Sequence, residues 1–174
     1  MKNMPATRED LLARLDALGI AATTVEHPPM FTVEDSQNLR GEIPGAHSKN
    51  LFLKCKKGTL WLVVALEDAR IDLKRLHTRI GSGRLSFGKA DLLLETLGVM
   101  PGSVTPFALI NDTGQKVRVV LDQGLMAHDM LNFHPLENTA TTSISSAGLL
   151  TFIRDCGHEP AIVDVNADAA ADGN

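Results

Sequence analysis

The chain has 174 residues, of which 44% are hydrophobic and 22% are charged, and this composition is that of an ordinary globular protein. Its length favours a single domain with a hydrophobic core. Only two cysteines are present, Cys55 and Cys156, which excludes a disulfide framework or a cysteine-based metal domain. The first residues are charged and amphipathic, and no segment approaches the roughly 18 apolar residues of a membrane span. We therefore expect a cytoplasmic protein without a membrane partner.

The net charge of −4 is unevenly distributed along the chain. Residues 40–89 contain 11 cations and four anions, so this segment carries +7 while the rest of the chain carries −11. Such an asymmetry can create a positive face that guides a polyanion to one site on an acidic protein. A solvated surface with scattered cations is the alternative, and charge alone does not exclude it.

The first half of the chain alternates between helical and strand-like patterns. Thr7, followed three residues later by Asp10, predicts a capped helix that runs to Leu18. Residues 50–55 and 59–66 predict a hairpin with a turn at Gly58. The other elements that we expect here are a strand over 23–26, a short helix from Thr32 through Asn38, a mobile loop over Arg40–Ser48, a helix from Asp72 to Ile80 and a strand over Leu85–Phe87.

The second half has a similar mixture of patterns. Two prolines and a glycine make residues 99–106 a loop. We expect a second hairpin formed by Phe107–Asn111 and Lys116–Asp122 around Asp112 to Gly114. The remaining elements are a helix over 89–97, strands over 130–133, 139–144 and 161–165, a helix over 147–156 and a disordered tail over 166–174. Together these elements predict one α+β domain over residues 1–165, with a curved, mostly antiparallel mixed sheet flanked by helices.

The common catalytic motifs are absent from the sequence. It contains no Walker-type phosphate loop, no dinucleotide fingerprint, no zinc-protease HExxH and no Gly-x-Ser-x-Gly elbow. None of the six histidines pairs with another at helical i, i+4 spacing, so we expect no zinc site. No nucleophile is evident, which limits the chemistry that the chain can perform on its own.

Three loop-borne stretches carry polar groups that could bind a ligand. His47–Asn50 offers a lysine and an amide at a strand entry, and residues 102–106 form a rigid turn whose backbone could face a ligand. In the third stretch His134 precedes a proline, which holds it extended, and the polar segment 139–142 follows. Taken singly, each stretch is better explained by a structural role, as an ordinary strand entry, a structural turn and a buried structural histidine respectively.

Three longer stretches that contain these patches are, in chain order, HSKNLFLKCKKGTLWLVVAL, LGVMPGSVTPFALIND and NFHPLENTATTSIS. In this order and spacing they resemble the free-standing prolyl-tRNA editing proteins of the YbaK/ProX family, and most closely its ProX branch. The resemblance extends from the N-terminal helix to the last strand and implies the fold of that family's editing domain.

The activity that this resemblance implies is hydrolysis of alanine from mischarged tRNA(Pro). A synthetase pocket shaped for proline cannot exclude the smaller alanine, so a second site that admits only the smaller residue restores accuracy. In the family the ribose 2′-OH of the terminal adenosine helps to activate water. The resemblance implies no metal and no organic cofactor. The implied partners are the acceptor end of tRNA(Pro) and, beyond it, prolyl-tRNA synthetase, but not DNA.

The resemblance also assigns roles to individual residues. Lys49, Gly102 and His134 match the positions implied in catalysis: Lys49 would pair with a phosphate or the ribose, and His134 would form a hydrogen bond or shape the pocket. Asn50 matches a substrate-binding position that favours alanine. The turn from Gly102 would position the aminoacyl end through its backbone, which adds Ser103, Val104, Thr105 and Pro106 as substrate-binding residues.

Two alternatives stay open. Within the same family the chain could act on cysteinyl- or seryl-tRNA, because the sequence does not reveal the volume of the pocket. In a different class, it could be a non-catalytic adaptor that binds tRNA or a synthetase. The presence of Lys49, Gly102 and His134 together favours the enzyme.

Overall fold

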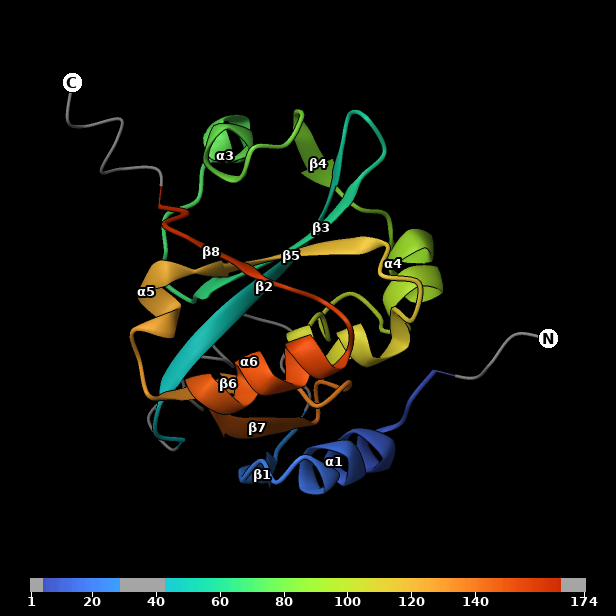
Figure 1. Cartoon of the computed structure of the whole chain (residues 1–174), viewed down its shortest axis with the longest axis vertical. Helices are drawn as coiled ribbons and strands as arrows, with labels where there is room; N and C mark the ends of the chain where they lie inside the picture. The colour runs from blue at the N-terminus through green and yellow to red at the C-terminus, as the bar shows by residue number, and fades with distance from the viewer. Residues whose placement is uncertain (1–4, 29–42, 167–174) are drawn as a thin grey trace.

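A computed structural model describes residues 5–28 and 43–166 of the chain (Figure 1). The strands are β1 (Ala22–Glu26), β2 (Ala46–Cys55), β3 (Leu60–Leu66), β4 (Leu85–Phe87), β5 (Val117–Asp122), β6 (Met130–Phe133), β7 (Ala140–Ser145) and β8 (Ala161–Val163). The helices are α1 (Arg8–Ala17), α3 (Leu73–Ile80), α4 (Ala90–Leu97), the 3-10 helix η1 (Pro106–Asn111), α5 (Gln123–Met126) and α6 (Ser146–Asp155). None of these helices, within the described ranges, is long and apolar enough to cross a membrane.

The strands form one mixed sheet in the order β1-β7-β6-β2-β3-β5-β8, with β4 paired to β2. Four of the pairings are antiparallel and three, β2 with β6, β3 with β5 and β5 with β8, are parallel. Helices and a mixed sheet confirm the α+β fold class. In Figure 1 the long strand β2 crosses the middle of the molecule, with α3 and β4 at one end and α1, β1 and β7 at the other.

Strand β2 changes its pairing partner along its length. Ala46 and His47 pair in parallel with β6, whereas Ser48 to Lys54 pair antiparallel with β3. The segment from His47 to Asn50 therefore lies where the two halves of the sheet meet. We expected a loop up to Ser48, and this was wrong for residues 46–48, because the pairing of Ala46 and His47 with β6 is too distant in sequence to be visible locally.

Local capping signals positioned several elements correctly. The Thr7 side chain accepts a hydrogen bond from Asp10 N, and the Asp10 carboxylate accepts one from Thr7 N, so α1 begins with a complete capping box. Asp72 caps α3, and Gly98 ends α4 in the left-handed conformation at φ +70°. The predicted hairpin of β2 and β3 is confirmed, as are the elements that correspond to β1, β4, β6, β7, α6 and β8.

The second predicted hairpin was wrong. Residues 106–111 form η1, which begins with Pro106 and is capped by the side chain of Thr105, an acceptor for Phe107 N. Three consecutive residues of η1, Phe107, Ala108 and Leu109, are buried, which a strand with one solvent face would not allow. Strand β5 pairs in parallel with β3 and β8 instead. The short helix α5 was not predicted.

The predicted helix from Thr32 through Asn38 lies outside the described residues, as do residues 40–42 of the predicted loop and residues 167–174 of the tail.

Phe107 anchors the larger of two hydrophobic clusters. Its ring packs edge-to-face against Phe133 at 5.7 Å and against Phe152 at 5.5 Å between ring centroids. Phe133 ends β6 and is followed directly by His134, while the loop with Gly102 immediately precedes η1. This aromatic contact therefore fixes the position of that loop relative to His134.

Candidate functional site

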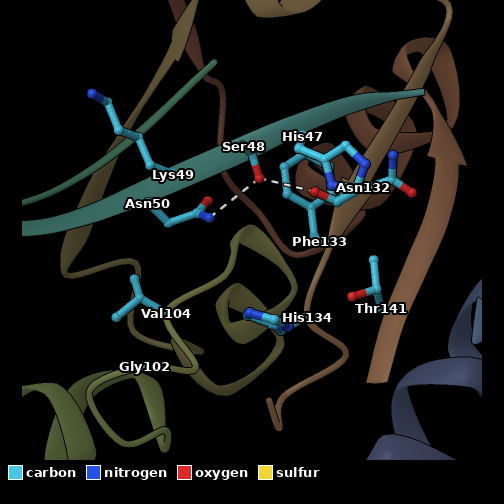
Figure 2. Close-up of a pocket in the computed structure, with 10 residues that line it drawn as sticks. All are labelled: His47, Ser48, Lys49, Asn50, Gly102, Val104, Asn132, Phe133, His134 and Thr141. Atoms are coloured by element: carbon cyan, nitrogen blue, oxygen red, sulfur yellow. Dashed lines mark hydrogen bonds between the residues drawn. The ribbon is translucent and has the colours of Figure 1, made fainter. Parts of the chain in front are cut away.

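A cavity of about 210 Å³ opens where β2, β6, β7 and the loop before η1 come together. Figure 2 shows the side chains that surround it. They come from segments that are far apart in the sequence: His47, Ser48, Lys49, Asn50, Gly102, Val104, Asn132, Phe133, His134 and Thr141. The three stretches that the sequence singled out thus meet at one place.

Five of the eight residues selected from the sequence line this cavity: Lys49, Asn50, Gly102, Val104 and His134. The other three do not line it. Ser103 and Thr105 are 8% and 0% exposed, and Pro106 is buried as the first residue of η1. Because the Thr105 hydroxyl caps η1, its side chain holds the end of the loop rather than a ligand.

The loop before η1 presents its backbone at Gly102 and Val104. Gly102 has φ +94°, a left-handed conformation that residues with side chains rarely adopt, and it lines the cavity. Neither the Gly102 N–H nor the Val104 N–H donates to a backbone carbonyl in the described part of the chain. Two backbone donors are therefore available at the cavity.

The Lys49 side chain is directed away from the rest of the cavity. Its Nζ donates a hydrogen bond to the carbonyl oxygen of Ala69, just after β3, and Figure 2 shows the chain pointing away from Gly102 and His134. Side chains alternate along a strand, so Lys49 and Asn50 leave β2 on opposite faces. The cation is thus held at the rim of the cavity by one neutral acceptor.

Asn50 belongs to a hydrogen-bond chain that stiffens the opposite wall. Its Nδ2 donates to Ser48 Oγ at 3.4 Å, and Ser48 Oγ donates to the carbonyl oxygen of Asn132 at 2.9 Å. The Asn50 Oδ1 atom is buried and has no hydrogen-bond partner among the described residues. A buried acceptor without a partner is costly in a folded protein, and because Asn50 lines the cavity, this oxygen can accept a hydrogen bond from a ligand or a water there.

His134 is held as a neutral ring. Its Nδ1 lies 3.0 Å from the carbonyl oxygen of Ala140, so Nδ1 carries the hydrogen. Burial lowers the pKa of His134 below its ordinary value of 6.5, the bond to Ala140 opposes this, and His27 lowers the pKa further. Its Nε2 therefore offers a lone pair at neutral pH, which suits a hydrogen-bond acceptor.

The remaining lining residues lie within the stretches that we singled out, but their individual contributions were missed. His47 and Ser48 precede Lys49 directly, and Asn132 precedes Phe133 and His134. Thr141 lies on β7, and its hydroxyl bonds Nε2 of His27, which is 114 residues away in the sequence. Only proximity along the chain could have indicated the first three, and no local signal links Thr141 to His27.

The residues that the structure describes include no group of three or more histidine, cysteine, aspartate or glutamate side chains that could hold a metal ion. The chemistry available at the cavity consists of backbone donors, one cation at the rim, amides, hydroxyls and neutral imidazoles. These groups bind and orient a polar substrate, and none of them is an activated nucleophile.

Comparison with known proteins identifies the family. A model of the aminoacyl-tRNA editing domain matches residues 27–152, so the chain belongs to this family. The chain is 43% identical over 162 residues to prolyl-tRNA synthetase associated domain-containing protein 1 of Bos taurus, covering 90% of this chain and 94% of that protein. It is 38% identical over 152 residues to the prolyl-tRNA editing protein ProX of Acetoanaerobium sticklandii, covering 87% and 93%.

The fold agrees with solved structures. A candidate trans-editing enzyme for prolyl tRNA synthetase superposes with a TM-score of 0.68 over 91% of this chain and 98% of its own, at 20% identity. The protein APE2540 superposes with a TM-score of 0.69 over 88% of this chain and 97% of its own, at 21% identity. These likenesses confirm the editing-domain fold, with its mixed sheet and flanking helices.

Proposed function

We propose that the chain is a trans-editing hydrolase that removes alanine from mischarged tRNA(Pro). The observation that carries this proposal is the meeting of Lys49, the Gly102 loop and His134 at one small cavity in a fold of the editing family. The cavity is open on one side, which suits the end of a tRNA whose body stays outside the protein. Its volume of about 210 Å³ suits a small side chain.

The proposed reaction is hydrolysis of the ester between the amino acid and the ribose 3′-oxygen. Water attacks the ester carbonyl, the bond to the ribose oxygen breaks, and the products are free alanine and tRNA. The neighbouring ribose 2′-OH assists the water, so no protein nucleophile is needed. The N–H groups of Gly102 and Val104, which donate to no backbone carbonyl among the described residues, can bind the carbonyl oxygen as negative charge develops on it.

Other groups hold the terminal adenosine. The Lys49 ammonium at the rim can exchange the Ala69 carbonyl for a phosphate or the ribose, since a charged acceptor binds an ammonium more strongly than a neutral one. His134 accepts a hydrogen bond through Nε2 and sets the depth of the cavity. We propose that the reaction needs no metal and no organic cofactor.

The contribution of the ribose is tested with Ala-tRNA(Pro) that ends in 2′-deoxyadenosine. We expect the chain to hydrolyse the normal ester and to lose nearly all activity on the deoxy ester, because its attacking water has no 2′-OH beside it. Equal rates on both esters would show that the ribose 2′-OH does not assist the attacking water, which would contradict the proposed mechanism. A competition assay with unlabelled deoxy substrate shows that it still binds.

A positive patch near the tip of the β2–β3 hairpin is proposed to contact the tRNA acceptor end. Lys54, Lys56 and Lys57 are exposed there, and Lys56 N bonds the carbonyl oxygen of Arg84 at 2.8 Å, which brings a fourth cation to the same end. Lys54 is five residues from Lys49, about 17 Å along the strand. Figure 1 places α3 and β4 at this end too.

Replacing all three lysines of this patch with alanine is expected to weaken tRNA(Pro) binding several-fold at low salt and much less at high salt, because salt screens exposed charges. The matched control is Lys116→Ala, which removes an exposed lysine outside the +7 segment. Filter binding across a salt series measures both variants. An identical loss at every salt concentration would show that the patch does not contact phosphates.

The neutral state of His134 predicts the pH dependence of the reaction. Because its pKa is lowered, the ring keeps its Nε2 lone pair until the pH falls below 6.5, and protonation then removes the acceptor. We expect kcat/KM to decline only on that acidic side, and we expect the decline to be absent in His134→Gln, whose amide does not titrate. His128→Ala, which removes an exposed histidine, serves as the control. A decline that persists unchanged in His134→Gln would assign it to another group.

A further inference from the structure

Three residues on the β2–β6 side of the cavity, His47, Ser48 and Asn132, use their side-chain hydrogen-bond donors within the protein. His47 Nε2 lies 3.0 Å from the carbonyl oxygen of Ile43 and must carry the hydrogen of that bond. Asn132 Nδ2 donates to the carbonyl oxygens of Pro44 and Ala46, at 3.1 and 3.2 Å. The Ser48 hydroxyl is spent on the Asn132 carbonyl. This part of the wall therefore presents acceptors rather than donors to a ligand.

His27 determines the direction in which the Thr141 hydroxyl points its hydrogen. His27 Nδ1 lies 2.8 Å from the carbonyl oxygen of Pro28, and a carbonyl only accepts, so Nδ1 carries the hydrogen. In the neutral ring Nε2 then has only a lone pair. Thr141 Oγ1 lies 2.8 Å from this Nε2 and must donate to it. The lone pairs of Oγ1 are left for the cavity that Thr141 lines.

A second acceptor stands on the same side of the cavity. His134 donates through Nδ1 to the Ala140 carbonyl, so its Nε2 is also a lone pair. The rings of His134 and His27 have centroids 6.3 Å apart, and Ala140 and Thr141 are neighbours on β7. Figure 2 shows the Thr141 oxygen turned toward His134. Thr141 Oγ1 and His134 Nε2 are therefore both acceptors, and both residues line the same cavity.

We propose that Thr141 binds the α-amino group of the aminoacyl ester and that His27 is the positioning residue that turns the Thr141 hydroxyl into an acceptor. This inference rests on the proposed function and adds a chemical criterion to selection by size. An α-ammonium group has three N–H donors, which suits Thr141 Oγ1 and His134 Nε2 together. A hydroxy acid of the same size offers one donor, and an N-acylated amino acid offers one donor and a bulky group.

The experiment compares two esters of the same tRNA(Pro), alanyl and lactyl, which differ only in an amino group against a hydroxyl. For the unmodified chain we expect kcat/KM to be about 10- to 100-fold higher for the alanyl ester, the range for loss of a hydrogen bond to a charged group. Thr141→Val is expected to reduce this ratio toward one by slowing the alanyl reaction. Thr141→Ser, which keeps the hydroxyl, should preserve most of the ratio.

His27→Ala tests the positioning role. It should lower the alanyl-to-lactyl ratio in the unmodified chain and have almost no further effect in the Thr141→Val background, because the two residues act through one hydroxyl. Thr141 is 4% exposed on a strand, where valine has nearly the same shape, so we expect Thr141→Val to fold, and its thermal unfolding is measured alongside.

Two results would overturn the inference. One is an alanyl-to-lactyl ratio near one in the unmodified chain, and the other is a ratio that Thr141→Val leaves unchanged. Both are distinct from failure of the proposed function, in which the unmodified chain hydrolyses neither ester and the inference falls with it.

Discussion

Replacing Lys49 with alanine is expected to lower kcat/KM for Ala-tRNA(Pro) by at least about 100-fold, the range seen when one preorganised polar group is removed from a reacting site. The reason is that Lys49 is the only lysine or arginine that lines the described cavity. Its Nζ is held by a single neutral acceptor, the Ala69 carbonyl, and is therefore available to an anionic partner. A single-turnover deacylation assay measures the loss.

Two variants distinguish the proposed role of Lys49 in hydrolysis from a general effect of positive charge and from an effect on folding. Lys116→Ala removes an exposed cation outside both the cavity and the proposed tRNA-binding patch, and it should change the single-turnover rate far less. Lys49→Arg keeps the charge but replaces a compact ammonium with a planar group, so we expect partial activity. Near-normal hydrolysis by a folded Lys49→Ala variant would remove the role that we assign to this residue.

The largest expected effect on stability comes from Asp112, which does not line the candidate cavity. Its carboxylate is buried and accepts hydrogen bonds from Lys116 N at 3.0 Å, Val117 N at 2.9 Å and His158 Nε2 at 2.9 Å. These bonds tie η1 to the start of β5 and to the segment after α6. Asp112→Ala leaves those donors unpaired in the interior, and we expect it to lower the free energy of unfolding by about 3–5 kcal/mol.

The pH dependence of this stabilisation follows from the direction of the pKa shift. Burial raises the pKa of Asp112, but the bonds from His158, Lys116 and Val117 outweigh burial and lower it overall. A lowered pKa contributes stability above the pKa of the unfolded chain, about 3.9, and this contribution is lost as the pH falls through the lower folded value. Urea unfolding from pH 7 to pH 3 should therefore show the gap between the unmodified chain and Asp112→Asn closing below about pH 4. A gap that is constant with pH would contradict the role of the charge.

The parts of the fold that depend on residues close together in the sequence could be predicted from the sequence. Thr7 with Asp10, Asp72 and Gly98 mark helix ends through short-range bonds, and the Gly58 turn marks a hairpin. The parallel pairing of β5 with β3 could not be predicted, because it joins residues more than 50 positions apart. Without that pairing, η1 and β5 resembled the two arms of a hairpin.

The candidate site, like the fold, could be predicted only in part from the sequence. Short motifs indicated the loop at Gly102 and the positions of Lys49 and His134, and these lie at the cavity. The direction of each side chain depends on the packed fold, so the sequence did not indicate that Thr105 points into the core. The bond between His27 and Thr141 joins residues 114 positions apart in the chain, near the paired strands β1 and β7, and has no local signature.

The most direct test of the central claim is a set of parallel deacylation time courses on Ala-tRNA(Pro), Cys-tRNA(Pro) and Pro-tRNA(Pro), each with and without a chelator. We predict rapid loss of alanine that the chelator does not slow, with proline retained. Loss of cysteine in place of alanine would contradict the proposed amino-acid preference within the editing family. Survival of all three esters would contradict the hydrolase itself and favour a non-catalytic tRNA-binding adaptor.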